Sequence, residues 1–264
     1  MSIRKLRMKC LLTICLLLTS IASAQNSKSR HPSLTRAQTK DAERRLADMG
    51  YWTGAVDGTF DPATRSALIA YQKWEGRPIT GHLTIAELEA IRTSASPNAR
   101  EPGYGHVEVD LDRQVLLIID DEGRVRVLPV STGSGKPFMD EGQTSIAYTP
   151  RGRFVVYDKT VGWEKAPFQS MYYSNYISGG VAIHGYRSVP IQPASHGCIR
   201  IPIFAAQEVS KLLTLGTIVL VYDQVSFVSG KSWAENPELK QSALVNSQSD
   251  YDGPEGTKAR PRAF

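Results

Sequence analysis

Two histidines and one cysteine fall within residues 184–200 of this chain. A thiol with its ordinary pKa of about 8.5 is mostly protonated at neutral pH, so a nucleophilic cysteine needs a base beside it. In the run Ser-His-Gly-Cys at residues 195–198, an extended backbone would put His196 and Cys198 on one face, with Cα atoms about 6.6 Å apart. The spacing therefore predicts that Cys198 is a nucleophile and His196 its general base.

Three neighbouring residues could complete such a site. Gly197 lacks a Cβ, so its amide and that of Cys198 could approach a substrate carbonyl and form an oxyanion hole. His184 could orient the base, contact the substrate or be a structural histidine. Arg200 shares the face of Cys198 if the strand continues, so it could bind a substrate carboxylate or brace the loop through charge-assisted hydrogen bonds.

The same residues permit two other interpretations. A cysteine is most often a small, buried apolar side chain without a chemical role. His184, His196 and Cys198 are also ligand types that suit zinc, but a catalytic zinc takes three protein ligands in tetrahedral geometry. Two ligands separated only by Gly197 would strain that geometry, so we expect no metal and no cofactor.

The first 24 residues have the order of a secretory signal peptide. Four basic side chains precede an apolar run over residues 10–21, and the small residues Ala-Ser-Ala follow at 22–24. That run is too short to span roughly 30 Å of hydrocarbon, which favours cleavage after Ala24 over a membrane anchor. Cys15 lacks a small residue directly before it, which argues against a lipid anchor there. We therefore expect an exported protein, in the periplasm or the extracellular wall space, with no stable membrane span after cleavage.

Export changes how the charges and cysteines are counted. Four of the 31 basic residues belong to the signal, which leaves 27 against 26 acidic ones and makes nucleic acid an unfavoured partner. Cys10 and Cys15 leave with the signal, so Cys198 would stand alone and form no internal disulfide. A composition of 41% hydrophobic and 22% charged residues fits one or two globular domains, and we take a monomer as the expected state.

A polar lead over residues 25–38 precedes a segment with helical periodicity, residues 39–92. The first helix of this segment ends at Gly50, the second begins at Asp61-Pro62, and the third has Thr84 and Glu87 at capping-box spacing. Apolar residues repeat on one face of each helix. The pattern predicts a small all-α domain of three helices.

The loop between the first two helices carries a specific motif. It reads Gly-Tyr-Trp-Thr-Gly-Ala-Val-Asp-Gly-Thr-Phe at residues 50–60, and the second helix contains Ala-Tyr-Gln at 70–72. Over residues 39–92 the chain resembles the peptidoglycan-binding domain of bacterial wall enzymes. The resemblance implies that Tyr51, Trp52 and Tyr71 could face glycan or peptide, and the alternative is that they form the core of the bundle.

Residues 93–103 are rich in small residues and proline, which is typical of a linker. From residue 104 the period becomes alternating. Short strands are predicted at 107–111, 115–119, 125–130, 153–158, 180–183 and 217–222, with one helix at 204–213. We therefore predict a mainly β domain over residues 104–223, a β-sandwich or partly closed barrel with one or two helices. Its strand at 180–183 would deliver His184 at its end.

An Ile-His-Gly at residues 183–185, followed by Ser-His-Gly-Cys-Ile-Arg at 195–200, resembles the L,D-transpeptidase catalytic (YkuD-type) domain of bacterial cell-wall enzymes. Further matches are Thr-Gly at 132–133, Thr-Pro-x-Gly-x-Phe at 149–154 and Met-Tyr-Tyr at 171–173. The resemblance implies that Cys198 forms a thioester with a stem tetrapeptide and that His196, oriented by the backbone carbonyl of Ser195, acts as base and then acid. Substrate-binding candidates are His184, Arg200 and Tyr173.

In this interpretation an amine acceptor resolves the thioester, and peptidoglycan stem peptides and glycan are the partners. One alternative keeps the thioester but lets water resolve it, which makes a carboxypeptidase. A second alternative is a wall-binding protein without catalysis. The tail over residues 224–264 is polar and has no sustained period, so we predict that it is flexible.

Overall fold

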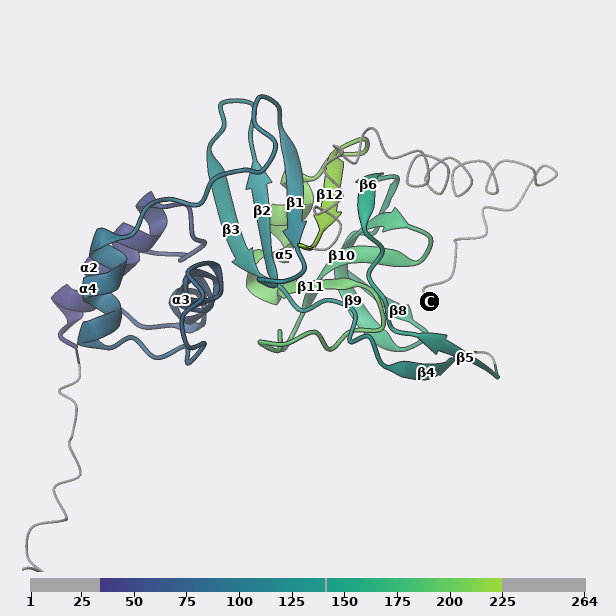
Figure 1. The fold of residues 1–264 in the computed structure, drawn as a ribbon, viewed down its shortest axis with the longest axis horizontal. Coiled ribbons are helices and arrows are strands. Elements are labelled where there is room, and N and C mark those ends of the chain that lie inside the picture. The colour runs from purple at the N-terminus through teal and green to yellow at the C-terminus, as the bar shows by residue number, and fades with distance from the viewer. Residues whose placement is uncertain (1–33, 141, 225–264) are drawn as a thin grey trace, which may run out of the picture. The chain divides into compact units, whose positions relative to one another are not determined.

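Helices make up the N-terminal part of the described chain, and strands make up most of the rest (Figure 1). The computed structural model describes residues 34–140 and 142–224. The predicted signal peptide, with Cys10 and Cys15, and residues 225–264 of the predicted tail lie outside the described residues. Within the described ranges, no helix combines the length and the apolar character needed to cross a membrane.

Three helices form the N-terminal bundle, and each follows a side chain that caps it. They are α2 (Arg36–Asp48) after Thr35, α3 (Pro62–Trp74) after Asp61, and α4 (Ile85–Thr93) after Thr84. Each capping side chain accepts a hydrogen bond from an amide of the first turn, which would otherwise have no partner within the helix. The three predicted helices are confirmed, and α2 begins within the segment predicted as a polar lead.

The aromatic residues considered as glycan contacts divide between core and surface. Tyr51 is 2% exposed and Tyr71 is fully buried, and their rings meet edge to face at 5.8 Å. Both therefore belong to the core of the bundle. Trp52 is only partly buried, and the guanidinium of Arg126 lies over its ring at 5.5 Å. Of the three, Trp52 is the one that is not buried in the core of the bundle.

The remaining chain forms two five-stranded sheets and a hairpin. The first sheet has the order β3-β2-β1-β12-β6, with strands β1 (His106–Asp110), β2 (Val115–Ile119), β3 (Val125–Pro129), β6 (Gly152–Val155) and β12 (Ile218–Tyr222). The second has the order β11-β10-β9-β7 with β8 paired to β9; its strands are β7 (Asp158–Lys159), β8 (Trp163–Ala166), β9 (Gln169–Ser178), β10 (Val181–Tyr186) and β11 (Ile199–Pro202). Strands β4 (Pro137–Asp140) and β5 (Gln143–Ile146) form the hairpin, and helix α5 (Ile203–Leu212) follows β11.

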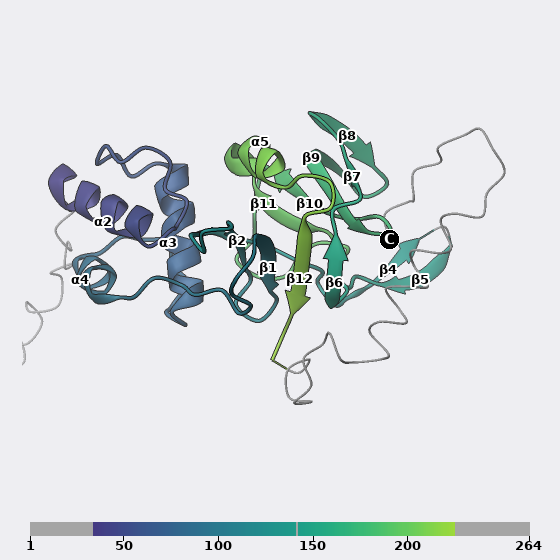
Figure 2. The same ribbon diagram turned by 90° about the horizontal axis from the view of Figure 1, so that it is seen from above.

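Strand β2 of the first sheet is buried on both faces, with the helical bundle on one side and the second sheet on the other (Figures 1 and 2). Leu116 and Ile118 of β2 belong to the core that the sheet shares with the second sheet and α5, whereas Val115, Leu117 and Ile119 belong to the core of the helical bundle. Successive side chains of a strand point to opposite faces, so a strand covered on both sides needs a continuous apolar run. This explains the five apolar residues in succession that the sequence contains at 115–119.

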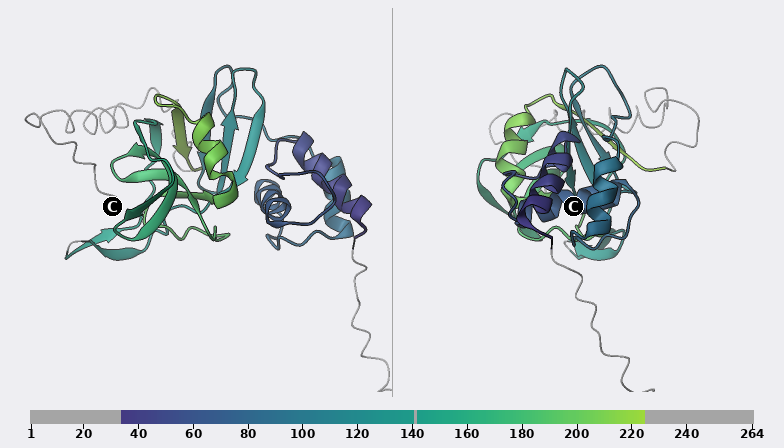
Figure 3. Two further views of the ribbon diagram at one scale, coloured as in Figure 1. Left: turned by 180° about the vertical axis from the view of Figure 1, so that it is seen from behind. Right: turned by 90° about the vertical axis from the view of Figure 1, so that its left-hand side faces the viewer.

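Helix α5 packs closely on the second sheet (Figures 2 and 3). A Cβ built on Gly185 of β10 would lie 2.5 Å from the Cβ of Ala206 in α5, so a larger residue there would push the helix away. The glycine of the His-Gly pair is therefore a packing requirement. The predicted fold class, a mainly β domain with a helical domain before it, is confirmed.

The segment predicted as a linker is fastened to the first sheet by a buried carboxylate. Glu108 on β1 accepts hydrogen bonds from the amides of Arg100 and Glu101, from the hydroxyl of Tyr222 and from the ring of His106. The side chains of Glu108 and His106 are both fully buried. A buried carboxylate requires such donors, and here two of them are linker amides, which fixes the end of the linker on the sheet.

Candidate active site

Cys198 directly precedes β11, and its side chain is buried against the second sheet. Its Sγ lies 3.6 Å from the carbonyl oxygen of Gly180 and 4.0 Å from Sδ of Met171, and only 3% of the residue is exposed. Burial raises the pKa of the Cys198 thiol, while a hydrogen bond from the amide of Ala182 and the charge of Arg200 act in the opposite direction. The thiol in this structure is therefore a protonated resting group.

The imidazole of His196 packs with two phenylalanine rings, which also contact each other at 5.2 Å. Its centroid is 4.9 Å from that of Phe138, which meets it edge to face, and 4.8 Å from that of Phe168, which stacks on it. The Nδ1 atom is buried and has no hydrogen-bond partner. Burial lowers the pKa of His196, and the charge of Arg200 lowers it further. The ring is therefore neutral at pH 7 and carries one nitrogen without a partner.

The chain bends between His196 and Cys198. Gly197 has a φ of 147°, which residues with a side chain rarely adopt. The predicted extended backbone is therefore wrong at this point. In the part of the chain that the structure describes, no hydrogen bond joins His196 to Cys198. Their pairing as base and nucleophile stays a prediction.

Ser195 closes the bend through its side chain. Its Oγ donates to the carbonyl of Cys198 at 2.6 Å and accepts from the amide of Gly197 at 3.1 Å, while its own carbonyl accepts from the amide of Ser134 at 2.9 Å. The Ser195 carbonyl thus binds a neighbouring loop and makes no hydrogen bond to Nδ1 of His196, which has no partner. The Gly197 amide expected in an oxyanion hole is occupied by Ser195 Oγ.

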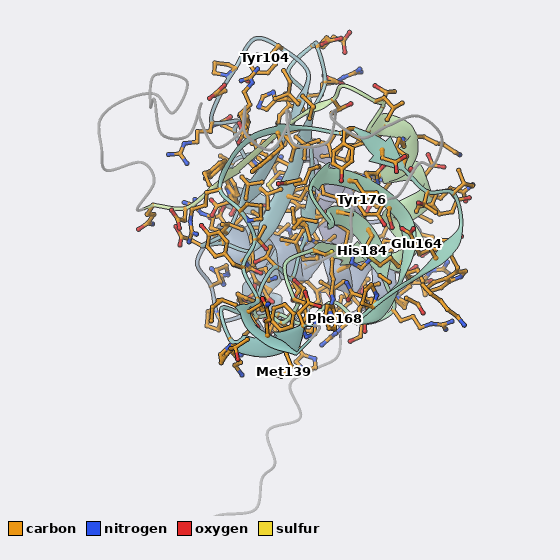
Figure 4. All side chains as sticks on the ribbon, turned by 90° about the vertical axis from the view of Figure 1, so that its right-hand side faces the viewer. Tyr104, Met139, Glu164, Phe168, Tyr176 and His184 are labelled. Atoms are coloured by element: carbon orange, nitrogen blue, oxygen red, sulfur yellow. The ribbon has the colours of Figure 1, made fainter. Side chains whose placement is uncertain are left out.

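His184 lies within β10, because this strand continues to Tyr186 and does not end at residue 183 as predicted. The side chain is completely buried, with Nδ1 3.0 Å from the carbonyl of Gly185 and Nε2 3.1 Å from Nε2 of Gln169. A carbonyl only accepts, so Nδ1 must carry the proton, and Nε2 then accepts from the Gln169 amide. Burial lowers the pKa of His184 to about 4. His184 is therefore a neutral buried group (Figure 4).

The buried side chain of Arg200 holds the loop before Ser195 in place through hydrogen bonds. Its Nε and Nη2 donate to Oε1 of Gln169 at 3.0 and 2.6 Å, and its Nη1 donates to the carbonyl of Ala194 at 3.1 Å. The guanidinium also lies over the ring of Tyr186, 4.2 Å from its centroid. Of the two roles considered for Arg200, these contacts match the brace, because its donors bind groups of the protein itself.

Tyr173 lies apart from the contacts of Cys198. It has a φ of 52°, its amide donates to the carbonyl of Gly162 at 2.9 Å, and its ring packs on that of Tyr172 and on the core between the sheets. The side chains packed with Cys198 are instead Met171, Tyr176, Ala182 and Ala166. The structure therefore does not bring Tyr173 into the cluster around the thiol.

Comparison with known proteins decides the family. The family model of the L,D-transpeptidase catalytic domain (YkuD) matches residues 104–221. A solved L,D-transpeptidase from Xylanimonas cellulosilytica is 36% identical, with 70% of this chain and 93% of that chain covered and a TM-score of 0.66. This chain belongs to the L,D-transpeptidase family. The family model of the peptidoglycan binding domain matches residues 35–91, which contain the helical bundle.

Two other relatives of this L,D-transpeptidase family member share less with it. An L,D-transpeptidase from Stackebrandtia nassauensis is 22% identical over 70% of this chain and 90% of that chain, with a TM-score of 0.41. The localization factor PodJL of Caulobacter vibrioides is 35% identical over 77 residues, which are 29% of this chain and 8% of that protein. The chain thus spans less than a tenth of the length of this curated relative.

Several residues around the candidate active site were not predicted from the sequence. Gln169 links His184 to Arg200, Phe138 and Phe168 enclose His196, and Thr149 donates through Oγ1 to the carbonyl of Gly197 at 2.6 Å. Gln169 could have been found from the sequence, because in a strand it lies on the same face as Met171, which belongs to the matched motif at 171–173. The phenylalanines could not, since a ring in a hairpin or turn does not indicate its neighbour in space.

The candidate active site contains no cluster of metal-binding side chains in the part of the chain that the structure describes. No three side chains of the types histidine, cysteine, aspartate and glutamate gather there in a way that could hold an ion. His184 uses both ring nitrogens in other contacts, and the Cys198 thiol faces the carbonyl of Gly180. The residues considered for zinc therefore point to different partners.

Proposed function

We propose that this protein is a peptidoglycan L,D-transpeptidase that works through a thioester on Cys198. The observation that supports the proposal is the neutral imidazole of His196, which lies two residues before the cysteine of a domain that matches the L,D-transpeptidase model and has a buried Nδ1 with no partner among the described residues. Leaving a buried nitrogen unpaired costs about 1–3 kcal/mol, so such an atom calls for a reason. A base held ready for the thiol proton supplies that reason.

The first step forms the thioester. His196 takes the proton from Sγ of Cys198, and the thiolate attacks the carbonyl carbon of the third residue of a stem tetrapeptide. The C–S bond forms, the C–N bond to the terminal D-alanine breaks, and the imidazolium of His196 returns its proton to the leaving amine. Because the resting thiol faces Gly180, this step requires Sγ to turn toward the imidazole.

The second step transfers the acyl group. His196 removes a proton from an acceptor amine, the amine attacks the thioester carbonyl, and the C–S bond breaks. The imidazolium returns the proton to the departing thiolate, which leaves a cross-link and the free Cys198 thiol. Neither step needs a metal, a cofactor or ATP. The developing oxyanion would take the place of Ser195 Oγ on the amide of Gly197, with the Cys198 amide as the second donor.

Two phenylalanines favour transfer over hydrolysis. Phe138 and Phe168 contact the partly exposed imidazole of His196 with apolar surface, which reduces the access of water to the base that would activate it. The carboxypeptidase reaction uses the same thioester, so it differs only in the group that resolves the intermediate. The peptidoglycan-binding bundle would hold the enzyme on its polymer, which raises the local concentration of stem peptides. Such a substrate implies export to the periplasm or wall space.

Mass spectrometry of the protein with a disaccharide-tetrapeptide tests the proposal. We expect an adduct on Cys198 equal to the substrate without its terminal D-alanine, and a cross-linked product after an amine acceptor is added. The variant Cys198→Ala should form no adduct but still bind peptidoglycan. Release of the acyl group by water alone would make the protein a carboxypeptidase, and an active alanine variant would refute the cysteine mechanism.

A further inference from the structure

A lysine of the helical bundle is buried against the first sheet. Lys73 in α3 is 4% exposed, and its Nζ donates to the carbonyl oxygens of Gln114 at 3.1 Å and Val130 at 2.8 Å. Burial lowers its pKa to about 7, and even the neutral amine keeps two N–H groups, one for each carbonyl. A buried amine is costly unless it is hydrogen-bonded. The amine therefore has a specific task at these two carbonyls.

The first carbonyl belongs to a residue that reaches toward the active-site loop. Gln114 lies in the turn between β1 and β2 with a φ of 56°, and its side chain is directed at Thr132. Oε1 of Gln114 accepts from the amide of Thr132 at 3.0 Å, and Nε2 donates to the Thr132 hydroxyl at 2.7 Å. Gln114 and Thr132 are both buried, so the two side chains hold each other in one arrangement.

Thr132 in turn holds the loop that carries the cysteine. Its carbonyl accepts from the amides of Ala194 and Ser195, both at 2.9 Å, and Ser195 closes the bend to Cys198. The second carbonyl bound by Lys73 precedes Ser131, whose backbone exchanges two hydrogen bonds with that of Arg200. The two carbonyls bound by Lys73 are therefore connected, through a few covalent and hydrogen bonds, to both ends of the segment 194–200 that contains the candidate active site.

We propose that Lys73 is a positioning residue that ties the docked helical bundle to the active-site loop through Gln114 and Thr132. The bundle then does more than tether the enzyme to its polymer, because its docking helps to fix the bend at residues 195–198. The route from Lys73 to the loop is a contiguous set of buried hydrogen bonds between packed elements. Energetic coupling between distant sites can be carried by such a network. The catalytic part of this inference rests on the proposed function, whereas the structural part does not.

The variant Lys73→Met tests the link, because methionine keeps the length and apolar surface of the chain and removes the donors. We expect amide exchange at Ala194 and Ser195, and alkylation of Cys198 by iodoacetamide, to rise about fivefold to tenfold. Exchange at residues 219–221 of β12 should stay unchanged, which separates a local from a global effect. The matched control is Lys211→Met, since Lys211 is exposed on α5 and forms its ion pair among the described residues with the exposed Glu208.

Turnover of a stem tetrapeptide should fall by a similar factor in Lys73→Met, while binding to peptidoglycan is kept. If Lys73→Met does not fold, Gln114→Asn serves instead, because asparagine tolerates the positive φ but is too short to reach Thr132. Wild-type exchange and alkylation in a folded variant would overturn the proposed link. Exchange and alkylation use no substrate, so this result is distinct from a failure of the transpeptidase proposal.

Discussion

His184 and Arg200 lie directly opposite each other on the parallel strands β10 and β11, and both bind the side chain of Gln169. The guanidinium fixes the amide orientation, because only Oε1 can accept from it. The amide then offers an N–H to His184, which fixes the tautomer of the imidazole. One neutral side chain thus satisfies a buried cation and a buried histidine at once.

This relationship makes Gln169 important for stability as well as activity. In Gln169→Leu the guanidinium of Arg200 would lose the acceptor of two of its hydrogen bonds, so we expect the free energy of unfolding to fall by about 2–4 kcal/mol. The rate of thioester formation should fall as well, because Arg200 also holds the carbonyl of Ala194. Urea unfolding and stopped-flow mass spectrometry measure the two effects. In Gln169→Glu the acceptor is restored, and unchanged stability in Gln169→Leu would exclude this role.

The buried imidazole of His184 predicts acid sensitivity. Its pKa is about 4 in the folded state against 6.5 when unfolded, so the unfolded chain binds the extra proton between these values. Stability from this group is fully present above pH 6.5 and is lost as the pH falls toward 4, by about 3 kcal/mol in all. We expect the free energy of unfolding in urea to fall over this range, and to fall less in His184→Gln. Parallel curves for the two proteins would contradict the assignment.

The sequence was informative where a local rule decides the structure. The helices follow from Thr35, Asp61 and Thr84, because a capping side chain acts on amides only two or three residues away. The strand at 115–119 was also predicted correctly, but the sequence alone does not show why all five residues of this strand are apolar. The reason is the bundle packed on the outer face of the sheet. The apolar run indicates burial on both faces, but it does not indicate which element covers each face.

The active-site bend shows the opposite case. An extended backbone was the geometry considered for residues 195–198, but a glycine is compatible with both a strand and a turn, and Gly197 adopts the turn. The hydrogen bonds of Thr132 and Thr149 hold that turn from segments far away in the chain. The residue types of the site were therefore predictable, whereas their geometry depends on contacts that spacing does not encode.

The ring of Phe168 is expected to set both the pKa of His196 and the fate of the thioester. In Phe168→Ala water would reach the imidazole, so the pKa of His196 should move up toward 6.5. The acidic limb of the kcat/KM profile would then shift to higher pH, on the order of one unit or less, and the share of hydrolysis over transfer would grow. Phe204→Ala is the matched control, since Phe204 is 42% exposed on α5. An unshifted limb with unchanged product ratio would show that Phe168 does not shield the base.

The buried amine of Lys73 predicts that stability rises in mildly alkaline solution. Its pKa is about 7 in the folded state against 10.5 when unfolded, so between these values the unfolded chain binds one more proton than the folded chain. By linkage the free energy of unfolding increases with pH across this window, by about 2 kcal/mol between pH 7.5 and 9.5.

Guanidinium unfolding of the wild type and of Lys73→Met at those two pH values isolates this contribution, because every other group titrates alike in both proteins. We expect the wild type to gain stability relative to Lys73→Met as the pH rises, while Lys211→Met should follow the wild type. A difference between wild type and Lys73→Met that does not change with pH would mean that the amine titrates normally. The buried position would then not disfavour the charged form, and the carbonyls of Gln114 and Val130 would hold an ammonium group.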